Sequence, residues 1–527
     1  MKEKGLLLVF ISDYKDGAKT GRYKVERGYG TPWWFEGTQT NDAPVKYLIS
    51  KALEDHHKIE KIICIVSKKV KDKGFEEFRC MVNDYIHNSK ELEAAYGSRQ
   101  IDFCPVDYPE SEDEISVRAS EVYKRIAAAD CIGGEDGAKI YIDYTGGLRD
   151  INFLMTAIIR YLEYHGVSCQ EIVYSSYNRD GTDKNRIYSL RCIYDMYQLL
   201  NGVEQFVSTG NAELLQSCYH DEGDRDANGL LEQIIRFSHA MSLCDVGNVD
   251  KTMDQLCQSL DRFDAKADKG SFFSVMFGDL TSIIRKKLYI EKDRAYSYPQ
   301  LIRWCLDNNM VQQALTLYVE KMPEFYCNEG IVEFSQEEEK GRKSRKNPGM
   351  AWRTEFFYGP FYDQLVTPEL KESRKRLETG CEAMTKECPM IENFEAKKLQ
   401  KLGTYEKKVI ALEAARTYPG RIPKAVTDDN LLLYNMMKYY LALKIIRNRI
   451  NHASEQEAQE DEIKAINQLE KNHGICMKTE FQNIKNLIWE GIGLYPGDIH
   501  KKELKITVKR DLSNGKPIVK GGRESLP

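Results

Sequence analysis

A chain of 527 residues is too long for a single hydrophobic core, so we expect two or three domains. Hydrophobic residues make up 42% and charged residues 30% of the sequence, as in ordinary globular proteins, and the net charge of -5 excludes a globally basic surface for nucleic acid. The 14 Cys are spread along the chain without a C-x-x-C pair, which indicates reduced thiols and excludes a disulfide scaffold.

The N-terminus contains one apolar run, Leu6–Ile11, which Ser12, Asp13 and Lys15 bring to an end. This run is too short for the hydrophobic part of a signal peptide and for a membrane span. We therefore expect a cytoplasmic protein that does not associate with membranes.

The first third of the sequence alternates short apolar runs with amphipathic stretches. The apolar runs predict buried strands at Leu6–Ser12, Ile62–Ser67, Ile101–Val106, Ala138–Asp143 and Glu171–Ser175, with a last short run at Arg186–Leu190. Helical patterns lie between them at Ala43–Glu54, Phe75–His87, Glu114–Ala129 and Asp150–His165. Strands that are apolar on both faces and alternate with helices predict a Rossmann-like parallel sheet with helices on both sides, in a first domain at 1–195.

After about residue 195 the strand signals fade and helical periodicity takes over. Helices are predicted at Met196–Phe206, Ala212–Cys218, Gly229–Leu243, Val249–Phe263, Phe272–Tyr289 and Pro299–Met322, and again at Asn393–Thr417, Asp428–His452, Glu457–His473 and Thr479–Tyr495. The charged stretch Glu337–Pro348 predicts an exposed loop or insertion. We expect a helical connecting region at 196–335, a second helical domain at 336–500, and a hairpin or a disordered tail at 501–527. The fold class is α/β followed by all-α.

The turn Asp143–Asp150 joins a predicted strand to a predicted helix, where open α/β sheets bind their ligands. Gly146 and Gly147 allow a close approach of the backbone, Thr145 offers a hydroxyl, and Arg149 adds a fork of donors beside a helix start that attracts anions. The alternative is a tight turn that needs its glycines for shape alone. We predict a nucleotide-binding turn.

A second polar cluster, Gly37–Pro44, precedes the first helix, with Asp42 as its expected N-cap. Gln39, Thr40 and Asn41 can read a base edge or a ribose, although a capped loop explains them almost as well. Upstream, Trp33-Trp34-Phe35 either stack on a base or pack the loop against the domain. The sequence lacks G-x-G-x-x-G after the first strand and lacks G-x-x-x-x-G-K-[ST], so a dinucleotide enzyme and a P-loop ATPase are disfavoured.

These pieces resemble the CARF domain of type III CRISPR ancillary proteins. They are the Leu6–Ser12 strand with its loop, Thr40–Pro44, and Asp143-Tyr144-Thr145-Gly146-Gly147-Leu148-Arg149, and Tyr197–Asn211 resembles the family's exit from this domain into helices. The resemblance implies a sensor of cyclic oligoadenylate. Its ligand-binding residues in this sequence are Ser12, Gln39, Thr40, Asn41, Thr145, Gly146, Gly147 and Arg149.

Proteins of this type often carry a C-terminal HEPN ribonuclease domain, whose mark is an Arg, four to six residues and a His. Arg447-Asn448-Arg449-Ile450-Asn451-His452 fits this mark, and so does Arg160 to His165, which lies in the α/β domain and is taken as a chance match. On the later helix, Ile445 and Ile446 are expected to pack inward, and Asn448 is placed four residues before His452 to orient its imidazole. The alternative is a solvated helix end whose basic residues favour the negative pole of the dipole.

The HEPN resemblance implies metal-independent cleavage of single-stranded RNA, with Arg447, Asn448 and His452 as the catalytic residues, no cofactor and no metal. His452 would transfer protons and Arg447 would stabilise phosphate charge, and a homodimer would supply two copies of each. The basic run Arg342–Lys346 either holds the RNA backbone or is a soluble loop. Two alternatives remain, namely a sensor whose helical region binds protein or DNA, and a ring nuclease activity in the first domain.

Overall fold

The computed structural model divides into two compact units, Met1–Tyr197 and Gln198–Pro527, and each is described by itself. The described residues are 4–25, 32–71, 73–97, 99–107, 116–117, 120–121, 124–125, 137–146, 149–178, 184–216, 218, 225–264, 272–291, 296–328, 332–334, 405, 408–409, 412, 429–451, 460–493, 506–511 and 516–521. In 149–154, 272–274, 327, 332–334, 429–433, 506–511 and 516–521 only the backbone is described.

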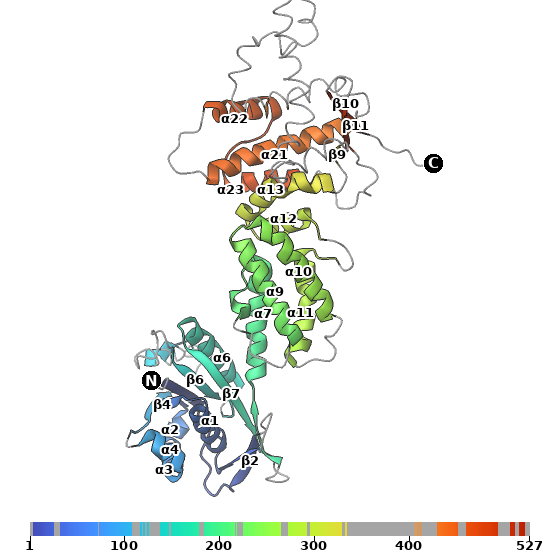
Figure 1. Ribbon diagram of the computed structural model, residues 1–527. Coiled ribbons are helices and arrows are strands. Elements are labelled where there is room, and N and C mark those ends of the chain that lie inside the picture. Colours follow the sequence, from blue (N-terminus) through green and yellow to red (C-terminus); the bar gives the residue numbers. More distant parts are fainter. Residues whose placement is uncertain are drawn as a thin grey trace, which may run out of the picture. The chain divides into compact units, whose positions relative to one another are not determined.

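The first unit is built on one eight-stranded sheet in the order β3-β2-β8-β7-β6-β1-β4-β5 (Figure 1). Its strands are β1 Lys4–Phe10, β2 Gly21–Val25, β3 Trp33–Gly37, β4 Lys58–Val66, β5 Asp102–Asp107, β6 Lys139–Asp143, β7 Ser168–Ser176 and β8 Arg186–Ser189. The five strands from β5 to β7 pair in parallel, and β1 at the centre is buried along Gly5–Phe10. The parallel core predicted from the apolar runs is confirmed.

The other edge of the sheet departs from the expected purely parallel arrangement. β8 pairs antiparallel with β7, and β2 and β3 form an antiparallel hairpin that joins the sheet through β8. Neither β2 nor β3 was predicted. The aromatic run upstream of the polar cluster is the edge strand itself, in which Trp33 and Phe35 pack edge-on against Tyr47 and Trp34 is 37% exposed.

Helices cover both faces of the parallel core, as the sequence predicts (Figure 1). On one face, α1 Asp42–Glu54, α3 Lys73–Asn88 and α4 Lys90–Tyr96 share a core cluster with β1 and β4, and the one-turn α2 spans Lys68–Lys71. On the other face, α6 Arg149–Tyr164 packs through Met155, Ile159 and Leu162. Most of the helix predicted at Glu114–Ala129 lies outside the described residues. This two-sided packing leaves the carboxyl ends of β1 and β6 as the place where a ligand can approach.

The second unit is helical, with one continuous hydrophobic core that runs from Leu199 to Ile492. Its helices are α7 Arg191–Thr209, which begins in the first unit, α8 Glu213–Gln216, α9 Arg225–Ser242, α10 Val246–Asp264, α11 Phe272–Leu288, α12 Tyr298–Asp307, α13 Val311–Asn328, α21 Asp429–Asn451, α22 Glu460–His473 and α23 Phe481–Gly493. Helix α13 packs on both α21 and α23. The helices of the predicted connecting region therefore share a core with those of the predicted nuclease region.

One predicted helix is in fact two. The sequence pattern at Pro299–Met322 indicates a single helix, but α12 ends at Asp307 and α13 begins at Val311. Asn309 takes a left-handed conformation with φ of 59°, and the Met310 amide donates to the Cys305 carbonyl at 2.8 Å. Asn tolerates this conformation better than most residues, so the helix ends there without Gly or Pro.

A small sheet in the second unit has the order β11-β10-β9. β10 Ile506–Asp511 and β11 Lys516–Gly521 form an antiparallel hairpin, and β9 Val332–Phe334 pairs in parallel with β10. Of the two alternatives for 501–527, the structure has the hairpin. The loop expected at Glu337–Pro348, the basic run Arg342–Lys346 and most of the helix expected at Asn393–Thr417 lie outside the described residues.

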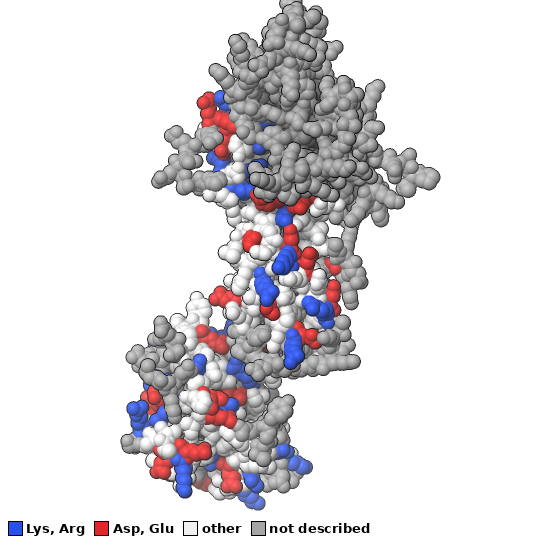
Figure 2. Space-filling view, viewed as in Figure 1, with Lys and Arg blue, Asp and Glu red and all other residues white. Residues whose placement is uncertain are grey.

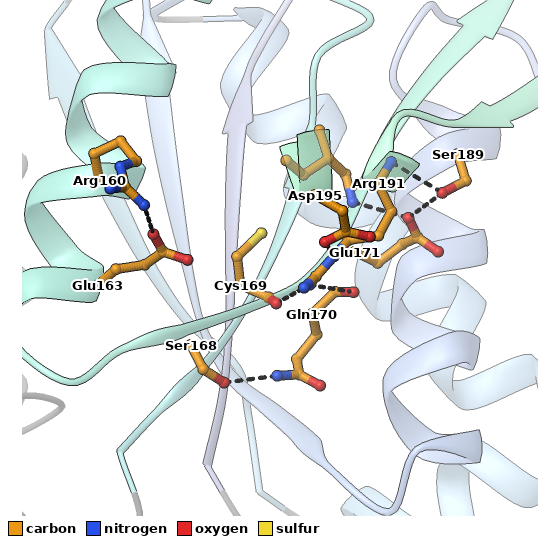
Figure 3. Close-up of polar contacts among 10 residues, drawn as sticks. Arg160, Glu163, Ser168, Cys169, Gln170, Glu171, Ser189, Arg191 and Asp195 are labelled. Carbon is orange, nitrogen blue, oxygen red and sulfur yellow. Dashed lines mark hydrogen bonds and ion pairs between the residues drawn. The ribbon is translucent and has the colours of Figure 1, made fainter. Parts of the chain in front are cut away.

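Polar contacts join the last two strands of the sheet to the start of α7 (Figure 3). Arg191, the first residue of α7, donates to the carbonyl oxygens of Cys169 and Gln170 in β7 and, through Nε, to Asp195 at 2.7 Å. In the adjacent strands, the Ser189 hydroxyl donates to the Glu171 carboxylate at 2.7 Å. The first turn of α7 is therefore bonded directly to β7.

Candidate functional sites

Asn41 ties three chain segments together at the carboxyl edge of the sheet. Its amide nitrogen donates to the Phe10 carbonyl at 3.0 Å and to the Asp143 carboxylate at 2.7 Å, and its amide oxygen accepts from the Ser12 amide at 3.0 Å. The side chain is only 3% exposed. The structure therefore brings Ser12, Asn41 and the Asp143 turn together, as predicted, and gives Asn41 the contacts of an internal cross-link.

Asp143, the last residue of β6, is fully buried and was not among the predicted ligand-binding residues. Burial raises the pKa of its carboxyl group to about 6, while hydrogen bonds with Thr145 and Asn41 act in the opposite direction. The folded state therefore binds a proton at Asp143 more tightly than the unfolded chain does. The sequence did contain a signal for this residue, namely a carboxylate at the end of a predicted strand and shortly before Thr-Gly-Gly.

We expect the stability of the first unit to fall as pH rises from about 4 to about 6, because ionised Asp143 is disfavoured only in the folded state. The full effect of a shift of this size is about 3 kcal/mol. Asp143→Asn should remove this pH dependence. The measurement is a urea unfolding curve at each pH. The fraction of folded protein is read from the peptides of β1 and β6 by a short pulse of hydrogen exchange, and the pulse is always given at the same pH. The exposed Asp102→Asn is the control, and an unchanged pH slope in Asp143→Asn would contradict the prediction.

The Thr145 hydroxyl makes its hydrogen bonds within the chain. Its oxygen accepts from the Ser175 amide at 2.8 Å, and it also bonds the Asp143 carboxylate. The Ser175 hydroxyl in turn donates to the Thr40 carbonyl at 3.5 Å. Thr145 and Thr40 therefore lie on either side of the end of β7, and Ser175, which sequence reasoning missed, holds them there.

The Gly37–Pro44 segment is held from both sides. Gln39 accepts from the Lys15 amide and donates to the Lys15 carbonyl, both at 3.0 Å. The Asp42 carboxylate accepts from the Thr38 amide and hydroxyl and from the Gln39 amide, each at 2.9 Å. The expectation that Asp42 is the N-cap was wrong, because the N-cap is Asn41 and Asp42 is the first helical residue. The Asp42 carboxylate instead holds the loop that precedes the helix.

Gly146 lies against the end of β1. A Cβ atom at this position would be 2.3 Å from the Phe10 carbonyl oxygen and 2.7 Å from the Ser12 hydroxyl. Such contacts are far inside van der Waals distance, so the turn needs glycine at this position for its own packing. Gly147 lies outside the described residues, and of Arg149 only the backbone, at the start of α6, is described.

The second candidate site lies at the C-terminal end of α21. Ile445 and Ile446 are fully buried, as expected, and the Arg447 guanidinium forms an ion pair with Glu320 of α13. The two side chains are 20% and 18% exposed, so the pair is largely shielded from water. Glu320 was not predicted because it is 127 residues away in the sequence. It sets the position of Arg447 from a neighbouring helix.

The neighbours of Arg447 on α21 are also fixed by other segments. The Asn448 amide donates to the Tyr405 hydroxyl at 2.8 Å, and Asn451 accepts from Gln312 of α13 at 2.8 Å. The proposed bond from Asn448 to the imidazole of His452 stays a prediction, because His452 lies outside the described residues. The chance match at Arg160 forms an i,i+3 ion pair with Glu163 on α6.

Lys and Arg side chains are interspersed with Asp and Glu on the face drawn in Figure 2. Among the described residues, no three His, Cys, Asp or Glu side chains are grouped as metal ligands. In the same part of the chain, every helix is too short or too polar to cross a membrane.

The architecture is thus an α/β unit with a buried polar cluster at its carboxyl edge, followed by a helical unit. Residues 195–287 match the family model for the second domain of the CRISPR-associated protein MJ1674. This segment spans most of α7 and continues through α11, and from residue 196 onward it lies in the predicted connecting region. The match confirms the resemblance to CRISPR-associated proteins.

Among solved structures, the chain is similar to Enterococcus italicus Csm6 bound to cyclic hexa-2'-fluoro-hexa-dAMP. The identity is 10%, the TM-score is 0.36, and the similarity covers 94% of this chain and 95% of that chain. A search of curated proteins finds no match. The assignment of the fold class therefore rests on the strands, helices and pairings of the chain itself.

Proposed function

We propose that this protein is an endoribonuclease of type III CRISPR defence that a cyclic oligoadenylate activates. In this proposal the carboxyl edge of the first unit binds the activator, and the end of α21 cuts single-stranded RNA without a metal ion. The observation that carries the proposal is the match of residues 195–287 to a domain of a CRISPR-associated protein, since this segment lies between the two candidate sites in one chain.

The sensor half of the proposal is supported by the way in which the edge is preorganised. The hydrogen bonds of Asn41, Asp143 and Thr145 fix three loops, and the start of α6, which follows the turn, would attract phosphate. A ligand that presses on the Asp143 turn acts on β7 through Ser175, and β7 is bonded to Arg191 at the start of α7. These contacts offer a route from ligand binding to the helices.

The nuclease half assigns separate tasks to the residues on α21. His452 would act as general base or acid on the ribose 2′-OH and the leaving oxygen, because an imidazole titrates near neutrality. Arg447 would stabilise the charge that develops on the phosphate, held in place by Glu320. A homodimer would bring two such pairs together, so that one imidazole accepts a proton while the other donates one.

The alternatives differ in which half of the molecule is active. A sensor whose helical region binds protein or DNA would bind the activator but cleave no RNA. A ring nuclease would consume the activator at the Asp143 turn. We do not favour the ring nuclease, because the Thr145 hydroxyl that would align the attacking ribose is bonded to Ser175 and Asp143.

The test is cleavage of a fluorescent single-stranded RNA in EDTA, with cyclic tetra- and hexaadenylate added in turn. We expect one ring to stimulate cleavage strongly, and we expect His452→Ala to abolish the stimulated cleavage while the ring still binds. Full stimulated cleavage by His452→Ala would refute the nuclease assignment. Ring binding without any RNA cleavage by the unmodified protein would favour the sensor alternative.

A further inference from the structure

The first unit contains a pocket of about 450 Å³ beside α3, within the size range of small-molecule sites. Its walls are the loop after β1, the segment from Glu36 to Asp42, and residues of α3. This α3 pocket shares Ser12, Gln39 and Asn41 with the proposed activator site, but Thr145 and Gly146 of the Asp143 turn do not line it.

The walls of the α3 pocket are held by contacts of their own. Gln39 bonds both backbone groups of Lys15, which fastens the loop after β1 to the segment before α1. On the other side, Lys73 of α3 bonds the Asp16 carboxylate of the same loop at 2.8 Å. Loops that are fastened at both ends keep a cavity open without a ligand, so binding there needs little reorganisation.

The chemistry of the lining suits a flat, uncharged group better than a phosphate. Aromatic and apolar surface comes from Tyr14, Phe78, Met81 and Tyr85. The lining side chains that carry a charge at neutral pH are four carboxylates and one amine, namely Glu36, Asp42, Glu77, Asp84 and Lys46. The excess of negative charge repels phosphate, while carboxylates accept hydrogen bonds from amino groups and aromatic rings stack on planar ones.

Glu77 and Asp84 supply the acceptors on the α3 side. They are seven residues apart, which is two helical turns, and both line the pocket. The Lys46 amine of α1 donates to the Glu36 carbonyl at 2.7 Å and lies 5.8 Å from the centre of the Tyr85 ring, and burial lowers the pKa of this amine. A ligand in the pocket can therefore meet these acceptors and this donor.

We infer that the α3 pocket holds one base of the bound nucleotide, a purine with an exocyclic amino group, while the phosphates stay at the Asp143 turn. The inference rests on the proposed function for the identity of the nucleotide, and it adds a base-reading subsite. It makes the choice of base a property of Glu77 and Asp84, outside the turn.

The first test measures the affinity of cyclic oligoadenylate by calorimetry for Glu77→Ala and Asp84→Ala. Both positions are exposed on a helix, where Ala is well tolerated. We expect each change to weaken binding about fivefold or more. Neither should affect a ring built from purine riboside, which lacks the amino group. The matched control is Glu76→Ala on the same helix, whose side chain does not line the pocket and pairs with Arg79.

The second test uses Cys80, an exposed thiol that lines the pocket. The rate of alkylation is measured by peptide mass spectrometry, without ligand and in the presence of cyclic oligoadenylate or of millimolar adenosine. The exposed Cys476 of the second unit serves as internal control. We expect both ligands to slow the reaction of Cys80 at least threefold and to leave Cys476 unchanged.

The outcomes separate this inference from the proposed function. If the ring binds but Cys80 reacts at its free rate and the two Ala variants bind normally, the base subsite is overturned and the sensor assignment stands. If no ring binds at all, the proposed function fails. In that case the adenosine experiment still tests the subsite. Protection of Cys80 by adenosine that is lost in Asp84→Ala would support the subsite, and no protection by adenosine would overturn the subsite as well as the proposed function.

Discussion

Replacement of Arg447 by alanine is expected to reduce activator-dependent RNA cleavage by about a hundredfold or more, the usual effect of removing a charged group that stabilises a transition state. Binding of the activator should not change, because Arg447 is in the second unit and the proposed activator site is in the first. Single-turnover cleavage at saturating activator measures the first effect, and calorimetry measures the second. Wild-type cleavage by this variant would refute the assignment of Arg447.

The fold of that variant needs a control, because the alanine leaves Glu320 largely buried without its guanidinium partner. The double variant Arg447→Met/Glu320→Gln removes both charges and should fold while remaining inactive. Arg449→Ala is the matched control on the same helix. The Arg449 side chain is 39% exposed, and its ion pair with Glu462 is long, at 3.8 Å. This variant should retain most of the activity. Loss of activity in Arg449→Ala equal to that in Arg447→Ala would indicate a general effect on the helix.

The parallel core could be predicted from the sequence because its residues carry the signal locally. Central strands buried on both faces need continuous apolar runs, and β1 and β4 have them. The hairpin of β2 and β3 carries no such run. Its strands lie at the edge of the sheet, where β2 alternates buried and exposed residues, and its partner β8 follows about 160 residues later in the chain.

The candidate sites stay predictions, but the structure shows which hydrogen bonds and ion pairs their residues already make. Asn41 was predicted to read a ligand, and the structure instead commits its amide to Phe10, Ser12 and Asp143, up to 102 residues away. The ion pair between Glu320 and Arg447 could not be predicted either, because the two residues are far apart in the sequence. A residue's type and its neighbours in sequence indicate what it can bond, but only the fold decides which bonds are already made.

Gly146→Ala is expected to weaken binding at the proposed activator site through a steric clash at the turn. The added methyl group would be 2.3 Å from the Phe10 carbonyl oxygen, and that oxygen already accepts a hydrogen bond from Asn41. Overpacking of this kind costs about 1–3 kcal/mol. If the same free energy is lost from activator binding, the affinity falls about fivefold to 160-fold.

The matched control is Gly229→Ala in α9, where a Cβ atom would meet no neighbour within 4 Å. A helical Gly→Ala change at an open position is neutral or stabilising, so it should leave both stability and activator affinity intact. Calorimetry with cyclic oligoadenylate and urea unfolding of each variant measure the two effects. Wild-type affinity in Gly146→Ala would mean that the activator does not depend on the contact between the turn and β1. The binding surface would then have to be sought away from the Asp143 turn.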